Sequence, residues 1–205
     1  MLRIISVKFQ WPSSKELFYN IDVQRGEIVT IEGPSGVGKS TLIDLISGFI
    51  QPLSGKIEWL GKDISCQHPS ERPIATIFQS DNLFDHLTCE FNASLGISPS
   101  GKLSFLNQQR LDKVFSELGI FDLRKRLPNQ ISGGQQARVS LARSLLSEKP
   151  IFLLDEPVSS LDKQTRIETL KVLKNTVIKH RITLIVVSHH DDDRKFLGAR
   201  SIKLH

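Results

Sequence analysis

The sequence predicts an α/β fold with a mostly parallel sheet and an inserted helical subdomain. Two short segments, 151–154 and 182–187, are apolar apart from Thr183, as in strands that are buried on both faces. A third predicted strand, 28–32, runs directly into a glycine-rich loop and then into a segment with helical spacing. Strands that alternate with helices along the chain are typical of a parallel sheet covered by helices.

Two helices of this core are marked by apolar residues at helical spacing. The one expected after the glycine-rich loop carries them at Leu42, Ile43, Leu45, Ile46, Phe49 and Ile50. The one expected between the two buried strands carries them at Ile167, Leu170, Leu173, Val177 and Ile178.

The middle of the chain shows helical patterns and no convincing strand. Leu111, Val114, Phe115 and Leu118 follow the spacing i, i+3, i+4, i+7, and Gly119 is placed to end that helix. A second helix is indicated by Val139, Ala142, Leu145 and Leu146. We therefore expect one domain over residues 1–205, with a core of about 1–85 and 148–205 and a helical subdomain of about 86–147.

The composition excludes several classes of protein. Hydrophobic residues make up 39% and charged residues 24% of the 205 residues, as in a soluble globular protein. No run approaches the roughly 20 apolar residues that cross a bilayer, and the first residues lack the pattern of a signal peptide. We expect a cytosolic chain unless another protein holds it at a membrane.

Charge and cysteine content give little further information about the class of protein. The formal net charge is +5, but the cations are scattered, which favours a solvated surface first and proximity to a membrane second. We expect no nucleic-acid partner. Two isolated cysteines, Cys66 and Cys89, are too few for a metal site or a disulfide framework.

The glycine-rich loop has the composition of a phosphate-binding loop. It fits the pattern G-x-x-x-x-G-K-[ST] at Gly33, Pro34, Ser35, Gly36, Val37, Gly38, Lys39 and Ser40, with Thr41 next. Glycines let backbone N–H groups turn toward an anion, and the following helix presents its positive end. Lys39 is expected to reach the outer phosphates of a nucleotide, and Ser40 to ligate Mg²⁺. The core is therefore predicted to be that of a P-loop NTPase, with ATP and Mg²⁺ as ligands.

Acidic residues follow the buried strand 151–154. Asp155 is expected to hold Mg²⁺, and Glu156 to act as general base for the attacking water. The alternative is that these carboxylates cap a helix near Pro157. His189 follows the last buried strand, and because ligands gather at the carboxyl ends of parallel strands, we expect it near the outermost phosphate. Gln79 offers an amide oxygen to Mg²⁺ or water, which alone is a weak signal.

A second glycine pair identifies a family. Residues 131–136 read Ile-Ser-Gly-Gly-Gln-Gln, which resembles the LSGGQ signature of ABC ATPases with isoleucine in place of leucine. Two glycines at a helix start suggest a second anion site. Two copies facing head to tail would each close the other's phosphate loop with Ser132, Gly133, Gly134 and Gln135, so a symmetric homodimer with two composite sites is expected.

The resemblance covers the whole chain and implies further roles. Trp11 lies where the family places an aromatic that stacks on adenine, although Phe9 is a rival and either ring also suits a core. Gln79 matches the Q-loop glutamine, residues 159–162 resemble the D-loop, and His189 matches the switch histidine.

The family implies an ATPase that drives transport through a membrane permease. Residues 78–88 and 96–103 resemble the ATPase subunit of bacterial thiamine importers, so thiamine or its phosphates is the expected solute. Transmembrane permease subunits and a periplasmic or extracellular solute-binding protein are the implied partners. The implied location is the cytoplasmic face of the bacterial inner membrane, as a peripheral subunit.

Two other functions are weighed against transport. DNA-handling ABC ATPases carry long coiled coils or zinc-binding cysteines, and neither pattern is present in the sequence. An ATPase of a non-transport membrane complex, of the cell-division type, differs from an importer subunit only in its partner. That alternative stays open at this point.

Overall fold

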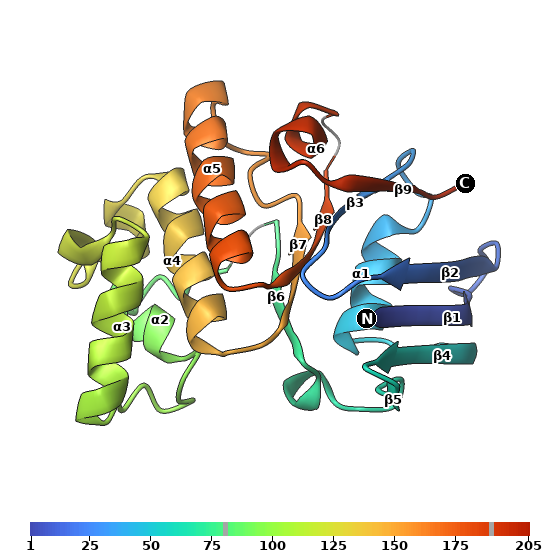
Figure 1. Ribbon diagram of the computed structural model, residues 1–205, viewed down its shortest axis with the longest axis horizontal. Coiled ribbons are helices and arrows are strands. Elements are labelled where there is room, and N and C mark those ends of the chain that lie inside the picture. The colour runs from blue at the N-terminus through green and yellow to red at the C-terminus, as the bar shows by residue number, and fades with distance from the viewer. Residues whose placement is uncertain (80–81, 189–190) are drawn as a thin grey trace. The chain divides into compact units, whose positions relative to one another are not determined.

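The computed structural model describes residues 1–79, 82–188 and 191–205 (Figure 1). The chain divides into two compact units. The first unit holds residues 1–76, 150–155 and 177–205, and the second holds 77–149 and 156–176. The domain boundaries expected from the sequence stay a prediction.

A five-stranded sheet forms the centre of the first unit. Its strand order is β6 (Ile74–Ile77), β7 (Ile151–Asp155), β8 (Thr183–Val187), β3 (Ile28–Glu32) and β9 (Arg200–Lys203), with the last residue of β6 in the second unit. The pairs β7–β8, β8–β3 and β3–β9 are parallel. This confirms the predicted α/β class, because the three expected strands are all present and lie side by side.

An antiparallel sheet completes the strands of this unit, and the sequence patterns above did not predict it. Its order is β2 (Leu17–Val23), β1 (Leu2–Phe9), β4 (Ser54–Trp59) and β5 (Lys62–Asp63). The signal was the alternation in β2, where Tyr19, Ile21 and Val23 are buried and the residues between them are exposed.

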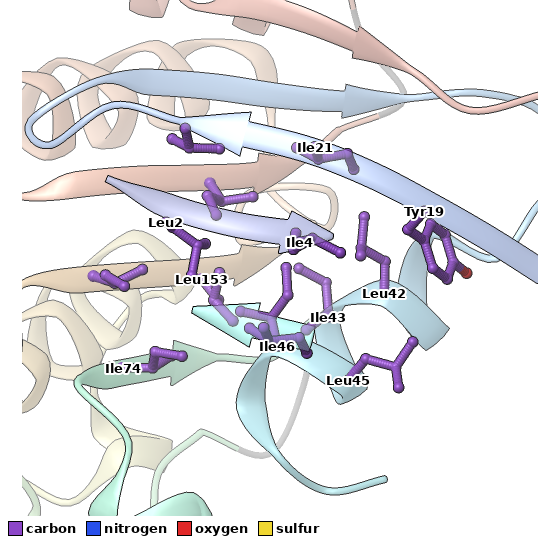
Figure 2. Packing of buried hydrophobic residues seen from close by; sticks show 14 of the residues in the cluster. Leu2, Ile4, Tyr19, Ile21, Leu42, Ile43, Leu45, Ile46, Ile74 and Leu153 are labelled. Atoms are coloured by element: carbon purple, nitrogen blue, oxygen red, sulfur yellow. The ribbon is translucent and has the colours of Figure 1, made fainter. Parts of the chain in front are cut away.

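The core of the first unit lies around helix α1 (Lys39–Ser47). Its side chains Leu42, Ile43, Leu45 and Ile46 pack in one cluster with residues of both sheets (Figure 2). The helix is shorter than its apolar pattern suggested, because Gly48 adopts a left-handed conformation (φ 87°) and ends it. Phe49 therefore lies beyond the helix with 53% of its surface exposed, and Ile50 also follows the helix end. Helix α6 (Asp191–Leu197) and a short 3₁₀ helix (Pro69–Glu71) belong to the same unit.

A buried arginine holds the end of α1. Arg72 is fully buried, and its guanidinium donates hydrogen bonds to the carbonyls of Leu45 (2.7 Å), Ile46 (2.8 Å) and Ser65 (2.6 Å). The last carbonyls of a helix carry partial negative charge, so a cation there is favourable. Arg72 ties the loop before β6 to the helix that follows the glycine-rich loop.

The second unit is helical, as expected. It contains α2 (Cys89–Ser94), α3 (Phe105–Glu117), α4 (Gly133–Leu146) and α5 (Lys163–Lys179) as far as residue 176, with short 3₁₀ helices at Phe121–Leu123 and Pro128–Gln130. Gly119 follows the end of α3 with φ 66°, which confirms its predicted place. The helix expected from the apolar spacing at residues 167–178 is confirmed as α5. Of the residues that marked it, Leu170, Leu173 and Val177 are buried, whereas Ile167 and Ile178 are exposed. Over the residues that the structure describes, no helix is long and apolar enough to span a bilayer.

Candidate functional site

The glycine-rich loop joins β3 to α1 without a capping side chain. Gly36 (φ 80°) and Gly38 (φ 99°) have left-handed conformations that favour glycine. Gly38 is the N-cap of α1, and no side chain caps it; its carbonyl accepts the first helical hydrogen bond, from Leu42 N–H at 2.9 Å. The first amides of α1 thus have no capping side chain, which suits an anionic ligand.

The Lys39 side chain is held inside this loop by backbone carbonyls. It is buried, and Nζ donates hydrogen bonds to the carbonyls of Gly33 (2.8 Å) and Pro34 (2.9 Å). Pro34, Ser35, Gly36 and Ser40 are exposed, while Val37 is half-buried. The loop therefore presents backbone and hydroxyl groups outward around an ammonium group, and this arrangement fits a phosphate group.

Asp155 ends β7, the strand that α1 contacts. The pKa of the Asp44 carboxyl in α1 is raised, first by burial and then by the negative charge of Asp155. The charge of Asp155 is therefore felt on the helix that begins with Lys39 and Ser40. A carboxylate and a hydroxyl of this kind fit the hard oxygen ligands that Mg²⁺ prefers. Among residues 1–79, 82–188 and 191–205, no group of three His, Cys, Asp or Glu side chains forms a metal site.

Trp11 is hydrogen-bonded to the first turn of α1. Its indole Nε1–H donates a hydrogen bond to Thr41 Oγ1 (3.2 Å), and its ring packs edge to face on Phe9 at 5.0 Å. Trp11 is 44% exposed, whereas Phe9 is half-buried against the core. Trp11 thus has ring surface free for stacking, and this favours it over Phe9 as the adenine platform.

Gln79 and Glu156 meet in the second unit. Gln79 Nε2 donates hydrogen bonds to Glu156 Oε2 (3.2 Å) and to Ser159 Oγ (3.4 Å). Ser159 Oγ donates in turn to the Glu156 carbonyl at 3.0 Å. Glu156 has φ 48°, a conformation that a non-glycine residue adopts at a cost of about 1–2 kcal/mol. Glu156 follows Asp155 directly, so the expected metal ligand and the expected base are adjacent in the chain.

The signature segment begins α4 with its own cap. Ser132 Oγ accepts a hydrogen bond from the Gln135 amide, and Gln135 Oε1 accepts one from the Ser132 amide at 2.9 Å. A Cβ added to Gly133 would lie 2.8 Å from Leu161 Cδ2, and one added to Gly134 would lie 2.5 Å from Thr165 Cγ2. Close packing thus favours glycine at both positions, most strongly at Gly134, and the role of the two glycines in a second anion site stays a prediction.

Side-chain hydrogen bonds fix two further candidate segments, the one before His189 and the predicted D-loop. His189 lies outside the described residues, but the preceding Ser188 donates a hydrogen bond from Oγ to the buried Asp193 (2.6 Å). Asp162, in the predicted D-loop, caps α5 by accepting hydrogen bonds from the amides of Gln164 and Thr165 (3.1 Å each). A hydrogen bond from the Thr165 side chain, followed by the bond from the Thr165 amide, holds the pKa of the Asp162 carboxyl below its usual range.

A buried asparagine organises the segment after Gln79, and sequence reasoning did not single it out. Asn92 is fully buried; it accepts a hydrogen bond from the Phe84 amide (2.8 Å) and donates to the carbonyls of Phe84, Leu87 and Thr88 (3.0–3.1 Å). The Phe84 side chain is 50% exposed. Asn92 thus fixes a turn that leaves an aromatic ring on the surface.

The comparisons with known proteins agree with this geometry. The family described as ABC transporter matches residues 19–159. The thiamine import ATP-binding protein ThiQ of Escherichia coli O157:H7 is 44% identical over 184 residues, which cover 90% of this chain and 79% of that protein. ThiQ of Shigella flexneri matches with the same identity and coverage.

Solved structures share the fold over nearly the whole chain. The dimeric structure of MJ0796, a bacterial ABC transporter cassette, has a TM-score of 0.83 at 28% identity and covers 100% of this chain and 94% of that one. The structure of cbiO1 from Clostridium perfringens, part of an ABC transporter complex, has a TM-score of 0.84 at 28% identity and covers 96% and 81%. The matched family and the ThiQ relatives lead to one conclusion: the chain belongs to the ABC transporter family.

Proposed function

We propose that this chain is the ATP-hydrolysing subunit of an ABC importer. The observation that carries the proposal is the start of α1, where an uncapped helix end and the buried Lys39 ammonium lie in one glycine-rich loop. A triphosphate needs many donors at contact distance, and this loop concentrates them. The family and the ThiQ relatives support the same assignment.

The glycine-rich loop and three residues outside it have roles in nucleotide and Mg²⁺ binding. The backbone N–H groups of residues 33 and 35–41 and the Lys39 ammonium bind the phosphates, and Trp11 stacks on the adenine. Ser40, Asp155 and Gln79 would hold Mg²⁺, which neutralises phosphate charge when it is bound. A related cassette, MJ0796, has been solved with ADP and Pi, which supports a nucleotide as ligand here.

Hydrolysis requires a base close to the attacking water. Glu156 takes the proton from that water, and Gln79 orients the carboxylate through the 3.2 Å hydrogen bond from its Nε2. His189 is proposed to contact the outermost phosphate and the water. Hydrolysis removes the outermost phosphate, so the contacts that ATP binding had formed open again.

A second copy of the chain completes each site in this proposal. Ser132, Gly133, Gly134 and Gln135 of one copy close on the nucleotide held by the other. The dimeric structure of the related cassette MJ0796 supports such a pairing. The closing motion reaches a transmembrane permease through the segment after Gln79, where Phe84 is exposed. A solute-binding protein outside the membrane completes the importer, and this chain works at the cytoplasmic face.

Thiamine or its phosphates is the proposed solute, on the likeness to the ThiQ proteins. The test is uptake of labelled thiamine by cells that depend on this chain. We expect uptake with the unmodified chain and none with Glu156→Gln. Equal uptake with both would refute the transport assignment, and normal uptake of another solute alone would refute thiamine.

Permease docking has its own test. We expect Phe84→Ala to weaken co-purification with the permease while the free subunit still binds ATP, because the half-exposed ring lies outside the nucleotide loop. Unchanged co-purification would show that Phe84 does not contact the permease.

The nucleotide assignment is tested by Lys39→Ala. Removal of the ammonium leaves the phosphates without their cation, so we expect ATP affinity to fall more than about 100-fold. Lys56→Ala removes an exposed lysine of β4 in the same unit and serves as the control. Isothermal titration calorimetry gives the dissociation constants. An affinity of Lys39→Ala within twofold of the unmodified chain would refute the proposal.

A further inference from the structure

The side chain of Tyr19 reaches from β2 to the last glycine of the phosphate loop. Its hydroxyl donates a hydrogen bond to the carbonyl of Gly38 at 2.8 Å. The ring belongs to the buried core cluster, as Figure 2 shows, and only 2% of the residue is exposed. Tyr19 is the one tyrosine in the sequence. A phenylalanine would fill the same space, so the hydroxyl has a role that core packing does not require.

Gly38 is also enclosed by the strand that carries Tyr19. A Cβ added to Gly38 would meet the Tyr19 hydroxyl and would lie 2.9 Å from Leu17 Cδ1. Gly38 itself has φ 99°, which only glycine adopts without strain. Strand β2 therefore packs directly on the backbone at the junction of the loop and α1.

The hydrogen bond fixes a peptide plane. The Gly38 carbonyl accepts from Tyr19 and from the Leu42 amide (2.9 Å), and both donors hold it in one direction. Because a trans peptide is planar, its carbonyl and the following N–H point in opposite directions. The Lys39 N–H is therefore turned away from the Tyr19 hydroxyl and from the first turn of α1. It is one of the uncapped amides at this helix start.

We propose that Tyr19 is a positioning residue for nucleotide binding, which orients the Lys39 amide toward the phosphates by holding the Gly38 carbonyl. This inference rests on the proposed function, because it requires that the loop binds phosphate. Burial raises the pKa of the Tyr19 hydroxyl to about 12, so the group is protonated and able to donate at neutral pH. Tyr19 acts through Gly38 and Lys39 and touches no reacting atom.

The test compares two variants that each remove one buried hydrogen bond. Tyr19→Phe keeps the ring and removes the hydroxyl. Thr183→Val removes a hydroxyl that accepts from the Gly26 amide at 2.9 Å in the same unit, away from the phosphate loop. Thermal unfolding shows that both are folded, and calorimetry measures the binding of ADP with Mg²⁺. Steady-state hydrolysis gives KM and kcat.

We expect Tyr19→Phe to weaken ADP binding about 3- to 10-fold, the range for one lost hydrogen bond. KM should rise by a similar factor with kcat within twofold, because the oriented amide contributes to binding before and during the reaction alike. Thr183→Val should change neither. A dissociation constant for Tyr19→Phe within twofold of the unmodified chain, or an equal loss in Thr183→Val, would overturn the proposal.

The unmodified chain provides an independent measurement if Tyr19→Phe does not fold. Its Lys39 amide signal in a nitrogen–proton correlation spectrum should shift strongly when ADP is added. An unmoved Lys39 signal, in a chain that calorimetry shows to bind ADP, would overturn the role of Tyr19 alone. A chain that binds no ADP would instead overturn the proposed function, and this inference with it.

Discussion

Two helices of this chain begin with glycine-rich segments, yet their first turns are built differently. Helix α1 follows Gly38, which provides no capping side chain, and the Lys39 ammonium lies within its loop. Helix α4 follows Ser132, whose hydroxyl and amide both bond to Gln135 in a capping box. No side chain caps the backbone N–H donors at the start of α1, whereas two backbone N–H donors at the start of α4 are bound in the capping box.

The difference shows that glycine has two distinct uses at a helix start. Gly36 has open space around its Cα, so its lack of a side chain leaves room for a ligand. Gly133 and Gly134 instead allow close packing against Leu161 and Thr165. We infer that the α1 start binds an anion by itself, and that the α4 start contributes only when a second copy presents a nucleotide to it.

The largest expected effect separates binding at the α1 start from the chemistry. Glu156→Gln keeps the size and polarity of the side chain but removes the base. Hydrolysis should fall about 10²- to 10⁴-fold, with ATP affinity unchanged. Glu168→Gln, an exposed acid of α5, is the control. Phosphate release and calorimetry measure the two quantities, and a hydrolysis rate within fivefold of the unmodified chain would exclude Glu156 as the base.

The packing account of the α4 start is tested by Gly134→Ala. The new methyl would lie 2.5 Å from Cγ2 of Thr165, a β-branched side chain with little rotamer freedom. We expect a loss of about 1–3 kcal/mol in the free energy of unfolding and no change in ATP binding by the monomer. Gly133→Ala should cost less, because Leu161 Cδ2 is the end of a more flexible side chain. Equal denaturant midpoints for Gly134→Ala and the unmodified chain would contradict this account.

The open-space account of the phosphate loop is tested by a matched pair of glycines. Gly36 (φ 80°) and Gly61 (φ 83°) have similar backbones, and neither has an atom within 4 Å of an added Cβ. Alanine at either position should therefore lower stability by a similar amount. Only Gly36→Ala should weaken ATP binding, by about tenfold (about 1.4 kcal/mol), because its methyl occupies ligand space. Equal affinities for the two variants would show that Gly36 does not border the ligand.

The smallest effect concerns the single tyrosine. Burial raises the pKa of Tyr19 from 10.0 to about 12. The folded state thus holds this proton more tightly than the unfolded state, so the stabilisation is complete below pH 10 and is lost as the pH rises through 12. The near-ultraviolet absorbance of tyrosinate follows this group alone. Ionisation near pH 10 in the folded chain would show that the hydroxyl is accessible to water.

The α/β class and the phosphate loop were predictable because their signals are local. Strand β3, the loop and the start of α1 are consecutive in the chain, and the strands β7 and β8 each contain an apolar run, at 151–154 and 184–187. The antiparallel sheet was missed because only β2 shows a clear alternation of buried and exposed residues. The pairs β1–β2 and β4–β5 are local, but the pair β1–β4 that joins them links distant segments.

Long-range contacts explain what the sequence did not reveal at the site. The bonds from Tyr19 to Gly38 and from Arg72 to the end of α1 join segments 19 or more residues apart. The capping box at Ser132 is formed by residues that are close in the chain, so its pattern was visible in the sequence. The signature motif nevertheless led us to interpret this segment as an anion site. Packing of Gly134 on Thr165 joins residues that lie 31 positions apart in the chain, and no spacing rule indicates it.

The most direct measurement is the molar mass of Glu156→Gln with ATP, determined by light scattering during size-exclusion chromatography. Without hydrolysis the closed pair does not reopen, so we expect a dimer that forms only with ATP. Adding Ser132→Arg places a bulky cation at the α4 start and leaves the phosphate loop intact. That double variant should bind ATP and remain a monomer. A double variant that still dimerises with ATP would contradict the account, because Ser132 would then not face the nucleotide of the second copy.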